Sequence, residues 1–341
     1  MTIELGFGLI TCQRYPGDPR TDHELYAEAL ELAQEAERLG FDSVWTSEHH
    51  FVDDAYLPSV LPLSAAMAAR TERITIGTAL LLAPLHEPLR VAEDAAVVDL
   101  IAGGRLVLGV GLGWREEEFE ALGIALGERV GRLEDSVSVY RQAWSGAPVT
   151  GGHVLRYPEV PVRPLPPRAG GPPIWIGAMS GPAIRRAGRI GDGFMATEVT
   201  PEGLREQVEL ARRAREAAGR DGPFAISVHH PTFAWEGDDA WELVRPFHWY
   251  VSWKYDDMDA ARHRAGDPPP APAIDEEAGR RLRDQIILGE PAGVADQIGR
   301  YANAAGGDLH YIARLYFPGM PFDLQRQALR IFAEEVAPKL R

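Results

Sequence analysis

The sequence has very little cysteine and no long apolar segment. Cys12 is the single cysteine among the 341 residues, so the chain cannot form an internal disulfide bond. Because Cys12 ends the first predicted strand, we expect it to be a small buried apolar residue. No apolar run is long enough to span a bilayer, and the N-terminus lacks the basic segment of a secretory signal. These absences lead us to expect a cytoplasmic protein.

Positive charge is also scarce in this chain. Its 35 lysines and arginines face 50 aspartates and glutamates, which gives a formal net charge of −15. Nucleic acid is not an expected partner, because binding a phosphate backbone requires a basic face. A surface this acidic also disfavours anionic membranes. A small-molecule substrate is therefore the expected partner.

The apolar segments have the pattern of an α/β fold. Eight strand candidates alternate with helical segments, and four junctions repeat a helix end, a glycine and a strand. This order implies parallel pairing with right-handed crossovers, so we predict a TIM (β/α)8 barrel that spans residues 1–341 as one domain. A doubly wound open sheet is the alternative, but residues 9–13 lack its glycine-rich fingerprint. The strand candidates are residues 3–10, 43–51, 74–82, 105–110, 173–177, 193–196, 224–229 and 309–312.

Two segments interrupt this alternation, and we predict both to be insertions over the carboxyl-terminal mouth of the barrel. Residues 147–173 are rich in proline and glycine, with short β-like pieces around Val149 and Val160. Residues 231–284 form the longest segment that we expect to be irregular, and they contain half of the eight tryptophans. Aromatic residues suit both a lid over an apolar substrate and a dimer surface, so both roles stay open.

Titratable side chains follow the second strand candidate. Glu48, His49 and His50 stand at its carboxyl end, where barrel active sites are built. Neighbouring strand residues point to opposite faces, so His49 and His50 cannot both enter the barrel, and we predict no metal site. A single histidine in the mouth can act as a hydrogen-bond donor or an acid/base. We predict His49 and Glu48 to be catalytic.

Small residues near two later strand ends suggest a ligand wall. Ser180 and Gly181 follow the fifth strand candidate and open a helix, where free backbone N–H groups can bind a phosphate. Gly177 lies just before them and would let a phosphate approach the backbone. Gly111 and Gly113 follow the fourth candidate, where glycines let a flat ligand lie against the chain.

Several longer motifs together resemble the bacterial-luciferase-like family of flavin-dependent monooxygenases and oxidoreductases. The resemblance implies a barrel that binds a reduced flavin at its mouth, with His49 as the active-site histidine and the flavin phosphate near Ser180 and Gly181. It also implies a non-prolyl cis peptide bond under the flavin ring at about Ala79 and Leu80, and a homodimer. The motifs that carry the resemblance are residues 40–51, 74–78, 86–94, 103–105, 109–119 and 187–194.

The identity of the cofactor depends on two departures from the family pattern. Relatives that use FMN often have an arginine at the position of Leu112, and residues 111–114 with 116–119 look closer to members that use a deazaflavin (coenzyme F-420). Glu48-His49-His50, by contrast, looks like the FMN monooxygenases, since deazaflavin members usually have Asp-His there.

The resemblance therefore implies a monooxygenase that takes reduced FMN from a separate flavin reductase and uses O2 to oxygenate a small, apolar organic substrate. A deazaflavin-dependent oxidoreductase that transfers hydride is the first alternative. A non-catalytic flavin-binding protein is the second, and a metal-dependent hydrolase is the last.

Overall fold

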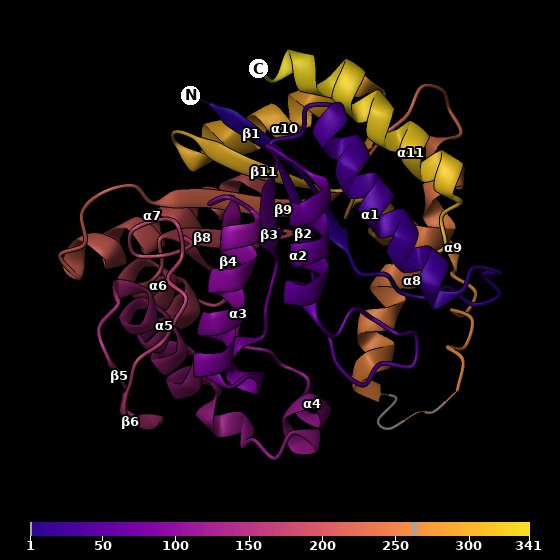
Figure 1. Cartoon of the computed structure of the whole chain (residues 1–341). Helices are drawn as coiled ribbons and strands as arrows, with labels where there is room; N and C mark the ends of the chain where they lie inside the picture. The colour runs from indigo at the N-terminus through magenta and orange to yellow at the C-terminus, as the bar shows by residue number, and fades with distance from the viewer. Residues whose placement is uncertain (1, 261–263, 265) are drawn as a thin grey trace.

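Eight parallel strands pair into a closed ring in the computed structural model, which describes residues 2–260, 264 and 266–341 (Figure 1). Pairing of the first ring strand with the last completes the closure, in register from Ile3 with Leu309 to Gly8 with Arg314. The predicted barrel is confirmed. In ring order the strands are β1 (Ile3–Ile10), β2 (Ser43–Thr46), β3 (Thr75–Thr78), β4 (Leu106–Val110), β7 (Ile174–Gly177), β8 (Gly193–Thr197), β9 (Ala225–Ala234) and β11 (Leu309–Arg314).

Helices cover the outside of this ring, and the two chain ends lie near each other (Figure 1). Neighbouring outer helices pack on one another, as α2 does on α3 and α6 on α7. Across the described part of the chain, no helix has the length and hydropathy needed to cross a membrane. The helices are α1 (Asp22–Arg38), α2 (Val60–Arg70), α3 (Pro88–Ile101), α4 (Glu116–Ala121), α5 (Arg129–Ser145), α6 (Gly181–Ile190), α7 (Pro201–Ala217), α8 (Ala240–Ala260), α9 (Glu276–Arg283), α10 (Pro291–Ala305) and α11 (Phe322–Ile331).

The repeated glycine junctions form the floor of the barrel. Gly40 takes a left-handed conformation at φ +84°, which a residue with a side chain rarely adopts. The aspartate near such a junction then accepts an N–H at or near the start of a neighbouring strand. Asp42 accepts from Leu5 at 2.8 Å, and Asp192 accepts from Ile174 at 3.0 Å. These side chains hold the amino ends of adjacent strands together, at the end away from the predicted site.

Two stacked tryptophans fill the inside of the barrel. Trp45 of β2 and Trp175 of β7 have ring centroids 5.3 Å apart, and both are buried. Their bulk fits because Gly77 of β3 leaves room: a Cβ built there would lie 2.2 Å from the Trp45 ring. Large and small residues on facing strands thus make the interior a packed core and not a pore.

The second predicted insertion differs from its expected irregular form. Residues 231–284 include the end of β9 and the helices α8 and α9, while residues 261–263 and 265 lie outside the described residues. The interpretation as irregular chain was wrong because α8 contains Pro246, a residue that normally disfavours a helix interior. One side of α8 faces the mouth of the barrel through His248, Val251, Ser252 and Tyr255.

The first predicted insertion lies beside α5 and does not line the cavity at the mouth. Residues 147–173 contain an antiparallel hairpin of β5 (Val149–Gly151) and β6 (Arg156–Val160), which matches the predicted β-like pieces. This hairpin packs against α5, where Asp135 accepts three backbone N–H groups from residues 153–155. None of its described residues lines the cavity at the mouth.

The packing of Trp45 predicts opposite effects for two glycine substitutions. Gly77→Ala should lower the free energy of unfolding by about 1–3 kcal/mol, because the new methyl group overpacks the barrel interior. Gly299→Ala is the matched control, since it lies inside α10 and no atom is within 4 Å of the place its new Cβ would occupy. That change should raise stability by up to about 1 kcal/mol through helix propensity. Urea unfolding measures both values, and equal effects would contradict this packing.

Candidate active site

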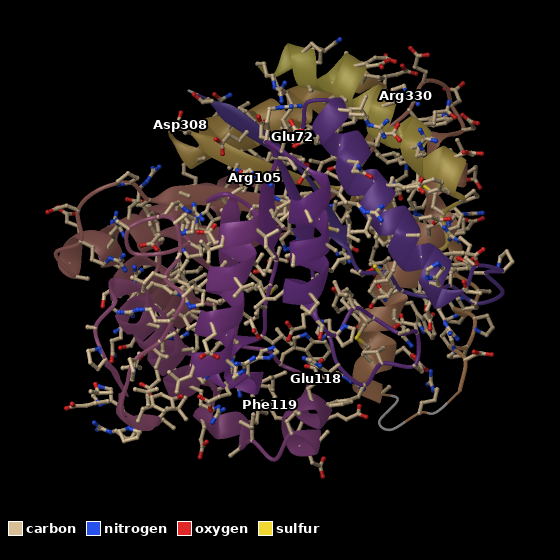
Figure 2. The ribbon with its side chains drawn as sticks, viewed as in Figure 1. Glu72, Arg105, Glu118, Phe119, Asp308 and Arg330 are labelled. Atoms are coloured by element: carbon tan, nitrogen blue, oxygen red, sulfur yellow. The ribbon has the colours of Figure 1, made fainter. Side chains whose placement is uncertain are left out.

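A cavity of about 550 Å³ opens at the carboxyl ends of the barrel strands. Strand ends around the ring form most of its wall, and α8 closes one side. Glu118 lies at this end of the molecule, whereas Arg105 lies at the opposite end, beside the floor (Figure 2). Active sites of TIM barrels are built at the carboxyl end, so this cavity is the candidate active site.

His49 lies in the wall of this cavity, just beyond β2, and its side chain is 6% exposed. Its Nδ1 is 2.9 Å from Oε1 of Glu118. A carboxylate only accepts hydrogen bonds, so Nδ1 carries the proton and Nε2 is left to face a ligand. The rings of Tyr56, Trp114 and Tyr255 stand edge-on around the imidazole, with centroids 4.9, 5.9 and 5.8 Å away. The arrangement holds one histidine in one tautomer and one orientation.

Glu118 is the hydrogen-bond partner of His49, and the sequence analysis did not single it out. It lies in the short helix α4, is fully buried, and also accepts the backbone N–H of His50 at 2.8 Å. Its second oxygen, Oε2, has no hydrogen-bond partner in the described part of the chain. Three glutamates follow one another at residues 116–118, so only the direction of α4 reveals which of them faces His49.

Glu48 pairs with two histidines other than His49, namely His50 and His86. Its Oε1 is 2.9 Å from Nε2 of His50 and 2.7 Å from Nε2 of His86. Burial disfavours the charged carboxylate, but the hydrogen bonds from both histidines hold the pKa of Glu48 below its ordinary value. The contact with Glu48 raises the pKa of His86 against the opposing effect of burial. Glu48 also lines the cavity, so its catalytic role stays a prediction.

Glu48, His50 and His86 also have the composition of a metal site. Their ligand atoms all lie within 4.8 Å of one another. The strand-alternation argument did not consider His86, which comes from a different loop. A metal would need both imidazoles neutral, whereas the raised pKa of His86 favours its protonated form. The geometry fits a carboxylate that accepts two hydrogen bonds, and the absence of a metal site stays a prediction.

Ala79 and Leu80 form a shelf on the cavity wall. The peptide bond between them is cis, as the resemblance predicted, and both residues line the cavity. Gly111 and Gly177 lie beside this shelf. A Cβ built at Gly111 would lie 2.6 Å from Cδ1 of Leu80, and one built at Gly177 would lie 2.2 Å from the same atom. These glycines therefore make room for the Leu80 side chain, which in turn presents an apolar surface to a flat ligand. Gly113, with φ +69°, continues the same wall.

The start of α6 forms one rim of the cavity. Ser180 is its N-cap residue and makes no side-chain capping bond, and Gly181 is the first helical residue. Ser180 lines the cavity, whereas Gly181 lies just behind it. The exposed side chain of Arg185 reaches back to this point, with Nη1 3.5 Å from the place a Cβ of Gly181 would occupy. A helix N-terminus beside a guanidinium suits a phosphate group, although Leu112 supplies no charge.

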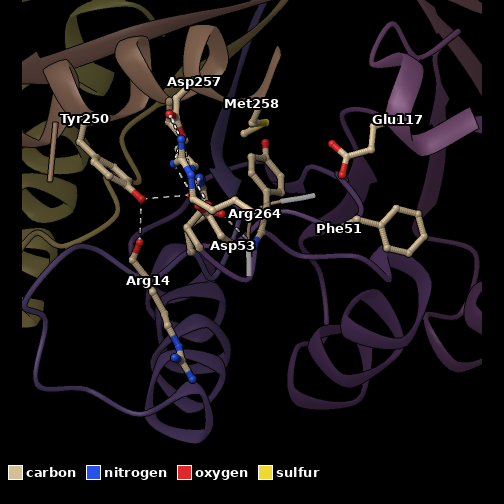
Figure 3. A network of polar contacts seen from close by, with 12 residues as sticks. Arg14, Phe51, Asp53, Glu117, Tyr250, Asp257, Met258 and Arg264 are labelled. Carbon is tan, nitrogen blue, oxygen red and sulfur yellow. Dashed lines mark hydrogen bonds and ion pairs between the residues drawn. The ribbon is translucent and has the colours of Figure 1, made fainter. Parts of the chain in front are cut away.

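An ion-pair network ties α8 to the loop that carries His49. Lys254 of α8 is 1% exposed and contacts Asp53 of that loop and Asp257 of its own helix. Arg264 adds contacts to the same two aspartates, at 3.2 and 2.9 Å (Figure 3). A buried charge is tolerated only when it is paired, so these contacts resist any outward movement of α8. The network thus holds the side wall of the cavity in place.

The pair of Glu48 and His86 predicts how stability depends on pH. The lowered pKa of Glu48 stabilises the fold above about pH 4.5, and the raised pKa of His86 stabilises it below about pH 6.5. Glu48→Gln should therefore cost most, about 1–3 kcal/mol, between these values and less on either side. Urea unfolding from pH 3.5 to 8.5 measures this difference. Glu209→Gln, on an exposed face of α7, is the control and should give a flat profile.

Comparison with known proteins finds one matching family and several related enzymes. The family model described as luciferase-like monooxygenase matches residues 5–308. The oxygenase component of a flavin-dependent trigonelline monooxygenase from Acinetobacter baylyi is 26% identical, over 97% of this chain and 94% of that protein. The F420-dependent glucose-6-phosphate dehydrogenase of Microbacterium testaceum is 30% identical, over 100% of this chain and 99% of that protein.

A solved structure has the same fold over the full chain. A monooxygenase from Streptomyces bottropensis superposes with a TM-score of 0.80, at 24% identity and with complete coverage of both chains. Relatives of this chain thus include monooxygenases as well as F420-dependent enzymes. The match of the family model over most of the sequence identifies the protein as a member of the luciferase-like monooxygenase family of enzymes.

Proposed function

We propose that the protein is the oxygenase component of a two-component flavin monooxygenase. It takes reduced FMN from a separate reductase and uses O2 to oxygenate a small, largely apolar organic substrate. The observation that carries this proposal is the buried pairing of His49 with Glu118 in the wall of the cavity, beside the shelf of Ala79 and Leu80. The full-length similarity to an oxygenase component supports it.

The cavity fits a reduced flavin along one wall. The shelf of Ala79 and Leu80 offers an apolar platform for the ring system, and the rim at Ser180 and Gly181 offers backbone N–H groups for a phosphate. Arg185 adds a positive charge beside that rim, which compensates for the absence of an arginine at Leu112. When bound there, reduced flavin supplies the electrons that activate oxygen.

His49 has a defined part in this chemistry. With its Nδ1 proton held by Glu118, Nε2 can accept or return a proton at the oxygen or substrate atom that faces it. Tyr56, Trp114 and Tyr255 of α8 surround the imidazole and limit its contact with bulk water, since the His49 side chain is only 6% exposed. Water exclusion protects reactive oxygen species until they meet the substrate.

Hydride transfer with a deazaflavin is the second candidate function. The similarity to F420-dependent glucose-6-phosphate dehydrogenases, at 30% identity over the whole chain, favours it. The same shelf and the same histidine suit a deazaflavin, because its ring system has the same shape. In that case His49 exchanges a proton with a substrate oxygen while hydride moves, and no oxygen is consumed.

An anaerobic titration separates the two functions. The purified protein is titrated with reduced FMN and, separately, with reduced deazaflavin, and the quenching of tryptophan fluorescence gives both dissociation constants. We expect FMN to bind at least about tenfold more tightly, a difference of about 1.4 kcal/mol. Tighter binding of the deazaflavin would overturn the proposal in favour of hydride transfer. Failure of both to bind would contradict a flavin function altogether.

Substitutions at His49 and Glu118 test the catalytic pair. His49→Ala should lower turnover of an accepted substrate by about 10²–10⁴-fold, because the acid/base is lost. Glu118→Ala should lower it by about 10–100-fold, since the imidazole loses the partner that orients it. FMN affinity should change by less than about threefold in both variants. Glu118→Gln is the matched control: it keeps an oxygen acceptor and should recover part of the loss. Unchanged turnover of His49→Ala would contradict this role.

A further inference from the structure

A second set of polar groups lines the cavity, on strands other than those that carry the shelf and His49. Glu198 follows β8, His229 lies in β9, and Arg314 ends β11, so three consecutive strands of the ring supply them. The register places them together, because Thr197 pairs with His229 and Pro231 pairs with Arg314. All three line the cavity, and we call them the polar end. Neither the acid/base pair nor the flavin wall uses them.

Arg314 is a buried guanidinium with unused hydrogen-bond donors. Its side chain is 8% exposed, and its Nη1 donates to Oε1 of Glu198 at 2.8 Å. That is its one hydrogen bond within the described residues, although a guanidinium carries five N–H donors. The centroid of the Tyr255 ring lies 5.7 Å from Cζ of Arg314, and the ring accepts no hydrogen bond from this guanidinium. Arg314 lines the cavity, so its remaining donors are available there to an acceptor on a ligand.

His229 adds a second unsatisfied group at the same place. Its Nδ1 is buried and has no hydrogen-bond partner in the part of the chain that the structure describes. Burial lowers the pKa of His229 to about 4, so the ring is neutral at neutral pH and offers one N–H donor. Because Nδ1 is shielded from the cavity, a ligand beside Arg314 can reach His229 only through the other ring nitrogen, Nε2.

We propose that the polar end is a carboxylate-binding subsite, so that the substrate is an organic acid whose carboxylate binds Arg314 and His229. This inference rests on the proposed function and names its substrate class. A planar carboxylate fits the fork of a guanidinium. Glu198 already balances the charge of Arg314, which favours a singly charged carboxylate over a doubly charged phosphate. The acid group then directs the apolar body of the substrate toward the shelf and His49.

The test compares carboxylates with their neutral amides. Benzoate, cyclohexanecarboxylate and hexanoate are titrated into the full-length protein by calorimetry, with and without saturating FMN, and each is paired with its amide. We expect at least one acid to bind about tenfold or more tightly than its amide. Arg314→Met should abolish this preference. Arg213→Met, an exposed arginine of α7 that also pairs with one glutamate, is the matched control and should preserve it.

A second variant keeps the test decisive if Arg314→Met does not fold. Glu198→Gln removes the carboxylate that competes for Arg314, so the acid should bind at least about threefold more tightly while its amide is unaffected. Equal affinities of every acid and its amide would overturn the proposal, as would a preference that survives in Arg314→Met or an unchanged acid affinity in Glu198→Gln. The titrations without FMN test the carboxylate subsite by itself, even if the proposed oxygenase function fails.

Discussion

Pairing between β1 and β11 closes the sheet, and this closure determines where every functional group can stand. Parallel strands in a closed ring present all their carboxyl ends at one rim. His49, the shelf at Ala79 and Leu80, the rim at Ser180 and the polar end at Arg314 are far apart in the sequence. They face one cavity because each follows or ends a strand of the same ring.

The loop that follows β2, predicted as part of a strand over residues 43–51, divides neighbouring side chains between different tasks. The His49 side chain faces Glu118 and the cavity, whereas the side chains of Glu48 and His50 pair with each other. The loop that carries all three is held by α8 through buried ion pairs at Lys254. A histidine fixed in this way has one nitrogen committed to the protein and the other available for chemistry, which is the minimum that proton transfer at an enclosed site requires.

Sequence reasoning could predict the barrel and the position of His49 at its mouth, because both depend on local patterns that tertiary contacts do not override. Eight apolar strand segments with glycine junctions can be recognised in the sequence, and so can a histidine at a strand end. Glu118 could not be predicted, since only the direction of α4 distinguishes it from its two neighbouring glutamates. Arg314 was missed because the predicted strand ended at Ile312, and a charged residue does not itself indicate a buried strand. Helix α8 was missed because Pro246 interrupts its pattern.

A crystal structure of the protein with bound FMN tests the central claim most directly. The claim is that the cavity at the mouth places a flavin between the Ala79–Leu80 shelf and His49. We predict that the ring system of the flavin lies on the shelf, its phosphate lies at the backbone of Gly181 beside Arg185, and Nε2 of His49 faces the remaining space. A flavin bound outside this cavity, or one whose phosphate lies at the polar end near Arg314, would contradict the account.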